Sequence, residues 1–488
     1  MEALLEWTGH PLIDVGLAAL CAMSGREDPS ALTLDDLDRA AEEMKEHYFS
    51  GVMDSYLSCV FTMNAEYTQP AGGAGKERRR KAYVDRVLFA HRYSGDRAVA
   101  GVSCFVSGRP ATHLLDRRQM PMLTGEGVLN FFPAGLGGLP LYGPYVTALQ
   151  ALPLAGRRSE GKLLIAHADD PALMVGLARR FLEDNRRLLN LAKSGSLPAS
   201  SAEAEALKRE VAAGQGKRGP KYPDAKGPKS LILHDLMELW EQRRGWGDQA
   251  PLGSLTVYLL SNSGQGPSLE MWYLPCNLLR FLFRADGGSA RSAWRTLLDS
   301  GWDEAGQRGR PGVSRNRVAE EVVDIYSSGV ADLGRAQRFL RSRLFEGIRR
   351  QRQDAAAWWE LTHVFLSEVL GMDAERIKAI KQFADTLADH IHQSNDRDLL
   401  RAVFYAEHAR DFRRALVRAQ REQARRGHLL FSLDQYVEVF EVEDNLGRLD
   451  WPLVRDLIAI RVIEQLHNAG YFTEPENAAL LEGGSQQS

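Results

Sequence analysis

Hydrophobic and polar positions follow two different patterns, one in the N-terminal part of the chain and one in the C-terminal part. In the N-terminal part, helical and strand patterns both occur. Residues 33–49, TLDDLDRAAEEMKEHYF, carry apolar residues at helical spacing behind a capping-box pattern from Thr33 to Asp36, which predicts a helix. Short apolar runs predict strands at 97–108, 162–168 and 254–264. We therefore expect helices and strands to be mixed in this region.

The C-terminal part has a helical pattern throughout. Segments such as AAAWWELTHVFLSEVLGM and AERIKAIKQFADTLADHIHQ place apolar residues three and four positions apart, and no proline occurs between residues 312 and 451. The polar, glycine-containing stretch at 303–317 separates the two patterns. The expected fold class is α+β, with a mixed N-terminal region at 1–313 followed by an all-α helical bundle at 314–488.

Two polar, glycine-rich segments at 69–83 and 193–229 interrupt the N-terminal region, and their composition predicts exposed, flexible loops. Each contains a basic cluster. The first cluster, which lies near Asn64, Tyr67 and Gln69, consists of Lys76, Arg78, Arg79, Arg80 and Lys81. The second consists of Lys217, Arg218, Lys221, Lys226 and Lys229. Asparagine, glutamine and tyrosine can contact or stack on bases, so the first cluster is a candidate DNA contact, with a solvated charge run as the alternative.

The overall charge does not indicate a nucleic-acid binder, because the formal net charge of the 488 residues is -3. The charge of part of the C-terminal region differs from this overall value. Between Arg335 and Gly427 there are 19 Lys or Arg against 13 Asp or Glu, so one face of the bundle could follow a phosphate backbone. Two flexible basic loops and a basic bundle favour a long polyanion over a small substrate.

Cysteine spacing and hydropathy bear on metal binding, cellular compartment and membrane contact. The four cysteines form no CxxC pair, so we expect no metal site, no cofactor and a reducing compartment. The N-terminus lacks a basic leader followed by an apolar stretch, and no run of 18 apolar residues occurs. These features predict a cytoplasmic protein without membrane contact.

The sequence offers little for catalysis, because it has no GxSxG, HExxH, Walker or EF-hand motif. In IAHADD, His167, Asp169 and Asp170 follow a predicted strand, where hydrolases often place metal ligands. A helix cap before Pro171 explains the aspartates without a metal. A metal-dependent nucleic-acid enzyme that uses His167 and Asp169 stays open as an alternative, as does a scaffold without DNA contact.

Segments along the whole chain resemble one protein family. The opening EWTGHPLIDVGLAAL (6–20) is similar to the start of the large subunit of type I CRISPR effector complexes (Cascade), in the Cst branch, or CXXC-CXXC family, of type I-A and I-B systems. The likeness is greatest to type I-B. Further segments resemble the family in the same order: FTMNAEYTQP (61–70), SCFVSGRPA (103–111), NFFPAGLGGLPLYG (130–143), ALQALPLAGRRSEGKLLIAH (148–167) and DWPLVRDLIAIRVIEQL (450–466).

The chain departs from this family in its cysteines. The family is named for paired CxxC knuckles, whereas here Ser107 stands three places after Cys104 and Thr62 three places after Cys59. We therefore expect the family's zinc site to be lost or degenerate.

The resemblance implies a non-catalytic subunit of an RNA-guided complex in the cytoplasm. Such a subunit recognises the protospacer-adjacent motif on duplex DNA, supports R-loop opening and holds the displaced strand along its helical bundle. The implied partners are the guide RNA with the Cascade backbone subunits, the target double-stranded DNA, a separate helicase-nuclease, and a helical small subunit translated from an internal start in the same gene. Antiviral defence and guided transposition are both compatible with this role.

The resemblance suggests a role in DNA contact for the glycine-rich segment NFFPAGLGGLPLYGPY (130–145). It lacks the third glycine of a dinucleotide fingerprint and the Lys-Ser or Lys-Thr of a P-loop. Backbone N–H groups around Gly137 and Gly138 could approach DNA, with Asn130 near a groove edge and Phe131 as a wedge between base pairs. The alternative is a tight turn with its aromatic residues in the core.

Overall fold

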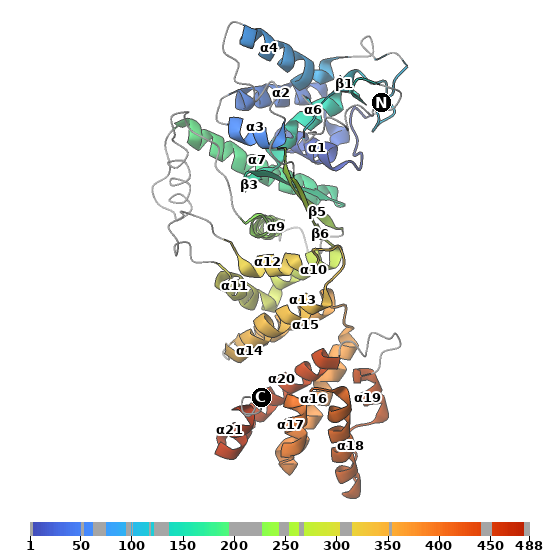
Figure 1. Cartoon of the computed structure of the whole chain (residues 1–488), viewed down its shortest axis with the longest axis vertical. Helices are drawn as coiled ribbons and strands as arrows, with labels where there is room; N and C mark the ends of the chain where they lie inside the picture. Colours follow the sequence, from blue (N-terminus) through green and yellow to red (C-terminus); the bar gives the residue numbers. More distant parts are fainter. Residues whose placement is uncertain are drawn as a thin grey trace. The chain divides into compact units, whose positions relative to one another are not determined.

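The chain folds into two compact units, Met1–Arg335 and Ala336–Ser488. The structure is a computed structural model that describes residues 3–49, 53–61, 75–93, 99, 101–116, 119–121, 136–194, 227–243, 253–262, 268–302, 315–350, 354–440 and 451–482. It confirms the expected α+β class with a helical C-terminal region (Figure 1). The division lies later than the expected boundary at 313–314, because α12 (Arg317–Asp324) packs against α9 and α11 of the first unit.

In its described residues, the first unit combines helices with two small sheets. Its helices are α1 (Pro11–Ser24), α2 (Leu34–Tyr48), α3 (Asp54–Val60), α4 (Gly75–Tyr83), α6 (Gly143–Ala151), α7 (Pro171–Ser194), α9 (Pro228–Arg243), α10 (Cys276–Ala285), α11 (Arg291–Ser300) and α12. The strands are β1 (His113–Leu115), β2 (Leu139–Leu141), β3 (Arg157–Ser159), β4 (Lys162–Ala168), β5 (Leu255–Ser261) and β6 (Ser268–Leu274). β1 pairs with β2, and the other four form an antiparallel sheet in the order β3-β4-β5-β6.

Helix α1 lies at the centre of this unit, because its sequence PLIDVGLAALCAMS is apolar on nearly every side. Residues from Ile13 to Ala22 are all buried, and α1 packs against α6, α7 and β4. Gly16 permits the closest approach, since a Cβ at this position would lie 2.1 Å from the carbonyl oxygen of Ala148 on α6. Any side chain at residue 16 would push the two helices apart.

Several local predictions are confirmed. Thr33 and Asp36 form the capping box of α2, with the side chain of each bonded to the backbone N–H of the other. Asp170 caps α7 by accepting a hydrogen bond from the N–H of Ala172 at 2.9 Å. The predicted strands at 162–168 and 254–264 correspond to β4 and β5.

Two predictions in the first unit were wrong. The described part of 97–108 forms turns with a single bridge between Ser103 and Pro110, because Gly101 and Gly108 adopt positive φ angles of 72° and 70° and reverse the chain. The predicted flexible loop at 69–83 is helical from residue 75, as α4. Its sequence GKERRRKAY is rich in strong helix formers and contains no proline.

The second unit is helical throughout its described residues. Its helices are α14 (Glu346–Arg350), α15 (Ala355–Glu368), α16 (Ala374–Ser394), α17 (Arg397–Tyr405), α18 (Ala409–Arg425), α19 (Leu433–Phe440), α20 (Trp451–Asn468) and α21 (Pro475–Glu482), while α13 (Leu333–Phe339) crosses the unit boundary. α16 and α20 form the main packed pair, and α17 and α18 lie side by side (Figure 1). Phe383, Phe412, Leu387 and Leu416 are buried in this core.

Candidate nucleic-acid interface

Among the described helices of the second unit, α18 has the largest excess of basic over acidic residues. Its sequence ARDFRRALVRAQREQAR contains six arginines and two acidic residues. The arginines are exposed along one side of the helix, and they are Arg410, Arg413, Arg414, Arg418, Arg421 and Arg425. At 1.5 Å per residue the row is about 22 Å long.

The opposite side of α18 anchors the helix in the bundle. Phe412, Leu416 and Ala419 are buried, and the Phe412 ring lies 5.4 Å from that of Trp451 and 6.0 Å from that of Phe440. Because the apolar residues recur at helical spacing, this burial leaves the arginine side facing solvent.

Polar contacts also hold α18 in place. The side chain of Gln423 bonds to Nδ1 of the buried His390 on α16 at 2.7 Å. The carbonyl oxygen of the Gln420 side chain accepts hydrogen bonds from the backbone N–H groups of Leu430 and Phe431. The arginine row is therefore carried on a helix fixed at several points.

The six arginines differ in their partners. In the described part of the chain, Arg413, Arg421 and Arg425 form no ion pair. Among the described acidic residues, Arg410 and Arg414 approach only Asp411, at 3.8 and 3.7 Å, and their side chains are 73% and 69% exposed. Most of the positive charge on this face is therefore not neutralised by the described residues.

Arg418 has a structural role as well. Its guanidinium lies 2.9 Å from Asp398 and 3.4 Å from Asp396, both at the start of α17. Asp396 also caps α17 through the N–H of Leu399. Burial raises the pKa of Asp396, but hydrogen bonds from His390 and Leu399 and the charge of Arg418 outweigh it and lower the pKa below its ordinary value. Arg418 therefore links α17 to α18.

The spacing of the arginines carries an energetic cost. Neighbouring arginines on this face stand three or four residues apart, and each like-charged pair at that spacing destabilises a helix by about 0.2–0.5 kcal/mol. An ordinary solvated helix avoids this cost by interspersing glutamate. A phosphate backbone would remove it, because each phosphate lies between positive charges and releases counterions on binding.

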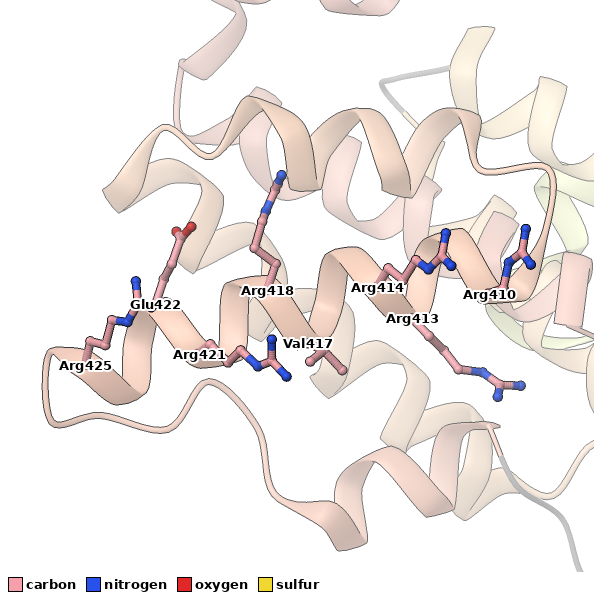
Figure 2. Close-up of a pocket in the computed structure, with 8 residues that line it drawn as sticks. All are labelled: Arg410, Arg413, Arg414, Val417, Arg418, Arg421, Glu422 and Arg425. Carbon is pink, nitrogen blue, oxygen red and sulfur yellow. The ribbon is translucent and has the colours of Figure 1, made fainter.

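Figure 2 shows how these side chains surround an open surface depression of about 620 Å³ on α18. Arg410, Arg414 and Arg418 point towards one edge of the exposed face and Arg413 towards the other edge, with Val417 between them. Arg421 and Arg425 continue the row towards the C-terminal end, beside Glu422. Guanidinium groups therefore lie on both sides of Val417 in an open depression, an arrangement suited to an extended anionic strand.

The basic cluster predicted at 76–81 lies on helix α4, where Arg78 and Lys81 are exposed. Of the second cluster, Lys229 lies in α9, where its ammonium pairs with Asp324 and lies 5.4 Å from the centroid of the Trp272 ring. The other predicted DNA contacts of these two segments fall outside the described residues, and they are Asn64, Gln69, Lys217, Arg218 and Lys221.

The glycine-rich segment is described from residue 136 onward, so Asn130 and Phe131 lie outside the described residues. Gly138 is buried, and a Cβ there would lie 2.9 Å from the carbonyl carbon of Leu114 and from the oxygen of Leu115. Its missing side chain thus lets β2 approach β1, which favours the structural interpretation for this glycine. Gly137 is exposed, with open space where a Cβ would stand.

The candidate catalytic residues make local contacts. Oδ2 of Asp169 accepts hydrogen bonds from the N–H of Ser254 at 3.0 Å and from its hydroxyl at 2.5 Å. His167 Nε2 lies 3.4 Å from the buried carboxylate of Asp14 on α1. Within the ranges that the structure describes, no group of three or more His, Cys, Asp or Glu residues could hold a metal ion.

None of the described helices is both long and apolar enough to cross a membrane. Comparisons of the chain with models of known protein families, with curated proteins and with solved structures find no match.

The arginine face of α18 was missed at the level of individual residues. The excess of Lys and Arg over Asp and Glu in Arg335–Gly427 indicates a basic bundle, but it does not show which helix carries the charge. A signal was present, since arginines recur three and four positions apart in RDFRRALVRAQREQAR while Phe412 and Leu416 mark the opposite side.

Proposed function

We propose that this chain binds nucleic acid through the arginine face of α18, without catalysing a reaction, as the large subunit of a type I-B-like Cascade. The observation that carries the binding proposal is the row of exposed arginines on α18, three of which have no ion pair in the described part of the chain. A helix fixed in a bundle and carrying this row is suited to the displaced strand of an R-loop. The wider role rests on the resemblance of the sequence segments quoted above.

In this role the two units have separate tasks. The first unit recognises the protospacer-adjacent motif and contacts the duplex, and the second holds the displaced strand. The guide RNA complex reads the remaining target sequence by base pairing, and a separate helicase-nuclease cuts the DNA. The local contacts of His167 and Asp169 give no specific support to the alternative of a metal-dependent enzyme.

The test is fluorescence anisotropy with a labelled single-stranded oligonucleotide and the full chain. The variant Arg413→Ala, Arg421→Ala, Arg425→Ala removes charges that have no ion pair within the described residues, so its fold should be retained. We expect its affinity to fall about tenfold or more at low salt, because phosphate contacts dominate such binding.

A matched control removes three positive charges elsewhere in the second unit. Arg338, Lys378 and Lys381 are exposed on α13 and α16 and have no ion pair within the described residues, and their replacement by alanine changes the net charge by the same amount. We expect the control to lose much less affinity than the α18 variant. Equal losses in the two would mean that only net charge matters, and the proposed interface would be wrong.

A further inference from the structure

Strand β6 forms one edge of the four-stranded sheet in the first unit. In the part of the chain that the structure describes, β6 pairs only with β5, so its other edge presents unpaired backbone N–H and C=O groups. All seven of its residues pair with β5 in unbroken register, from Ser261 opposite Ser268 to Leu255 opposite Leu274. A strand of this regularity is a ready template for another strand.

One face of β6 is apolar and exposed. Leu269, Met271 and Tyr273 alternate along the strand, and they are 57%, 54% and 39% exposed. Their partners on β5 belong to the same face, and the next row, on β4, includes Leu163 and Ile165, which are fully buried. The helices α1, α3 and α7 pack on β4 or β5, so the apolar face continues beyond the helices that cover it.

Proteins usually protect such an edge with a lysine, a proline, a bulge or a very short strand. The sequence of β6, SLEMWYL, contains neither lysine nor proline, and its register shows no bulge. Its single charged residue, Glu270, lies on the other face and pairs with Lys162 of β4. The free edge therefore carries no charge that would repel a second strand.

The strand is also complementary to itself. If two copies pair antiparallel about Met271, Leu269 of one copy lies opposite Tyr273 of the other, and Met271 lies opposite Met271. On the second face Glu270 lies opposite Trp272, so no like charges meet. Aromatic and aliphatic pairs at directly opposed positions contribute about 0.2–1 kcal/mol each.

We propose that the occupant of this edge is a second copy of the chain, joined through antiparallel β6–β6 pairing into a two-fold dimer with a continuous eight-stranded sheet. Such an interface is isologous, as a two-fold axis requires. Seven-residue strands bury little area, so the dimer is weak and concentration-dependent. This inference does not depend on nucleic-acid binding by α18.

Cysteine cross-linking tests the register directly. Residues opposed in an antiparallel pair have Cα atoms about 4.5–5.5 Å apart, within the range of a disulfide. Under mild oxidation, Met271→Cys should form disulfide dimers by itself. Leu269→Cys and Tyr273→Cys should cross-link when mixed, at least about fivefold more than either variant alone, because residues two places from the axis do not face their own copies.

Wild-type protein under the same oxidation controls for the native cysteines, of which Cys276 is partly exposed. Sedimentation equilibrium of the wild type and of Met271→Lys supplies an independent measurement without oxidation. We expect the lysine to weaken dimerisation tenfold or more while leaving the unfolding midpoint unchanged. A wild type that stays monomeric at all concentrations, or cross-linking that is equal for every cysteine position, would overturn the proposal.

Discussion

Arginine serves different purposes in the two units. In the first unit, Arg157 and Arg180 converge on the fully buried carboxylate of Asp235, at 3.1 and 2.7 Å. In the second unit, Arg413 and Arg421 on α18 are exposed and have no ion pair within the described ranges. The former hold secondary-structure elements together, while the latter leave their charge available to a partner.

The difference shows that the partner of an arginine, rather than the number of arginines, indicates its role. Helix α7 contains RRFLEDNRR, which is as basic locally as much of α18. Yet Arg186 of α7 makes a bidentate pair with Glu43 of α2, with both N–O distances at 2.7 Å. In a charge-assisted, bidentate pair of this kind the guanidinium N–H donors are already engaged, so few remain to bind a phosphate.

Separating the units should produce the largest effect on binding. A chain ending at Arg335 lacks α18, and we expect it to lose most of the single-strand affinity of the full chain. A chain of residues 336–488 has a buried core of its own and should retain folding and binding. Anisotropy titrations of both pieces, with circular dichroism to verify folding, measure this. Stronger binding by the N-terminal piece would reverse the comparison.

Removing the buried carboxylate of the first unit should have the largest effect on stability. Asp235→Ala leaves Arg157 and Arg180 partly buried without their common partner, which we expect to cost about 3 kcal/mol. Urea unfolding of the N-terminal unit gives this value. By contrast, Arg413→Ala should leave the stability of the second unit within about 0.5 kcal/mol. A neutral Asp235→Ala would mean that the buried pair adds nothing.

The Glu43–Arg186 pair predicts a pH dependence in the first unit. Burial raises the pKa of Glu43, but hydrogen bonds from His47 and Arg186 outweigh burial and hold the pKa at about 2, below the ordinary 4.5. The stability from this pair is therefore fully present above about pH 4.5 and is lost as the pH falls towards 2.

We expect Glu43→Gln to cost about 1–2 kcal/mol at pH 6, since a charge-assisted hydrogen-bonded pair is lost while part of it remains exposed to solvent. The difference from wild type should shrink from pH 4.5 to pH 3.5. Urea midpoints at the three pH values measure it. A difference that stays constant with pH would show that the carboxylate charge is not involved.

Arg418 is intermediate between the ion-paired arginines of the first unit and the unpaired arginines of α18. Its replacement should give the smallest measurable loss of stability. Its side chain is 45% exposed and pairs with Asp396 and Asp398 on α17. Arg418→Ala should therefore cost about 0.5–1 kcal/mol of stability in the second unit, whereas Arg421→Ala should cost none. Thermal unfolding of the two single variants compares them. Equal midpoints would place Arg418 with the unpaired arginines.

Much of the fold could be predicted from local sequence. The capping box of α2, the cap of α7 and strands β4 and β5 follow from residue types within a few positions of one another. Gly101 and Gly108, seven positions apart, and the helix formers of α4 are also local signals, although the polar, glycine-rich composition of 69–83 favours a loop. Strand β6 was missed because the alternation of polar and apolar residues in SLEMWYL stops after Met271, where Trp272, Tyr273 and Leu274 are all apolar.

The candidate site depends on contacts between residues distant in sequence. Nothing local distinguishes Arg186, which pairs with a residue 143 positions away, from Arg421, which has no ion pair in the described residues. Likewise, the role of Gly138 follows from its contact with β1 rather than from the glycine-rich pattern around it. Tertiary packing therefore decides which basic residues are available for binding.

The salt dependence of binding tests the central claim most directly. For the full chain, the logarithm of the association constant for single-stranded DNA is measured against the logarithm of the salt concentration. Each phosphate contact contributes about 0.7 to this slope, so Arg413→Ala, Arg421→Ala, Arg425→Ala should reduce its magnitude by about two. The control variant at Arg338, Lys378 and Lys381 should leave it nearly unchanged. An unchanged slope in the α18 variant would contradict the account, because these arginines would then form no contact with phosphate.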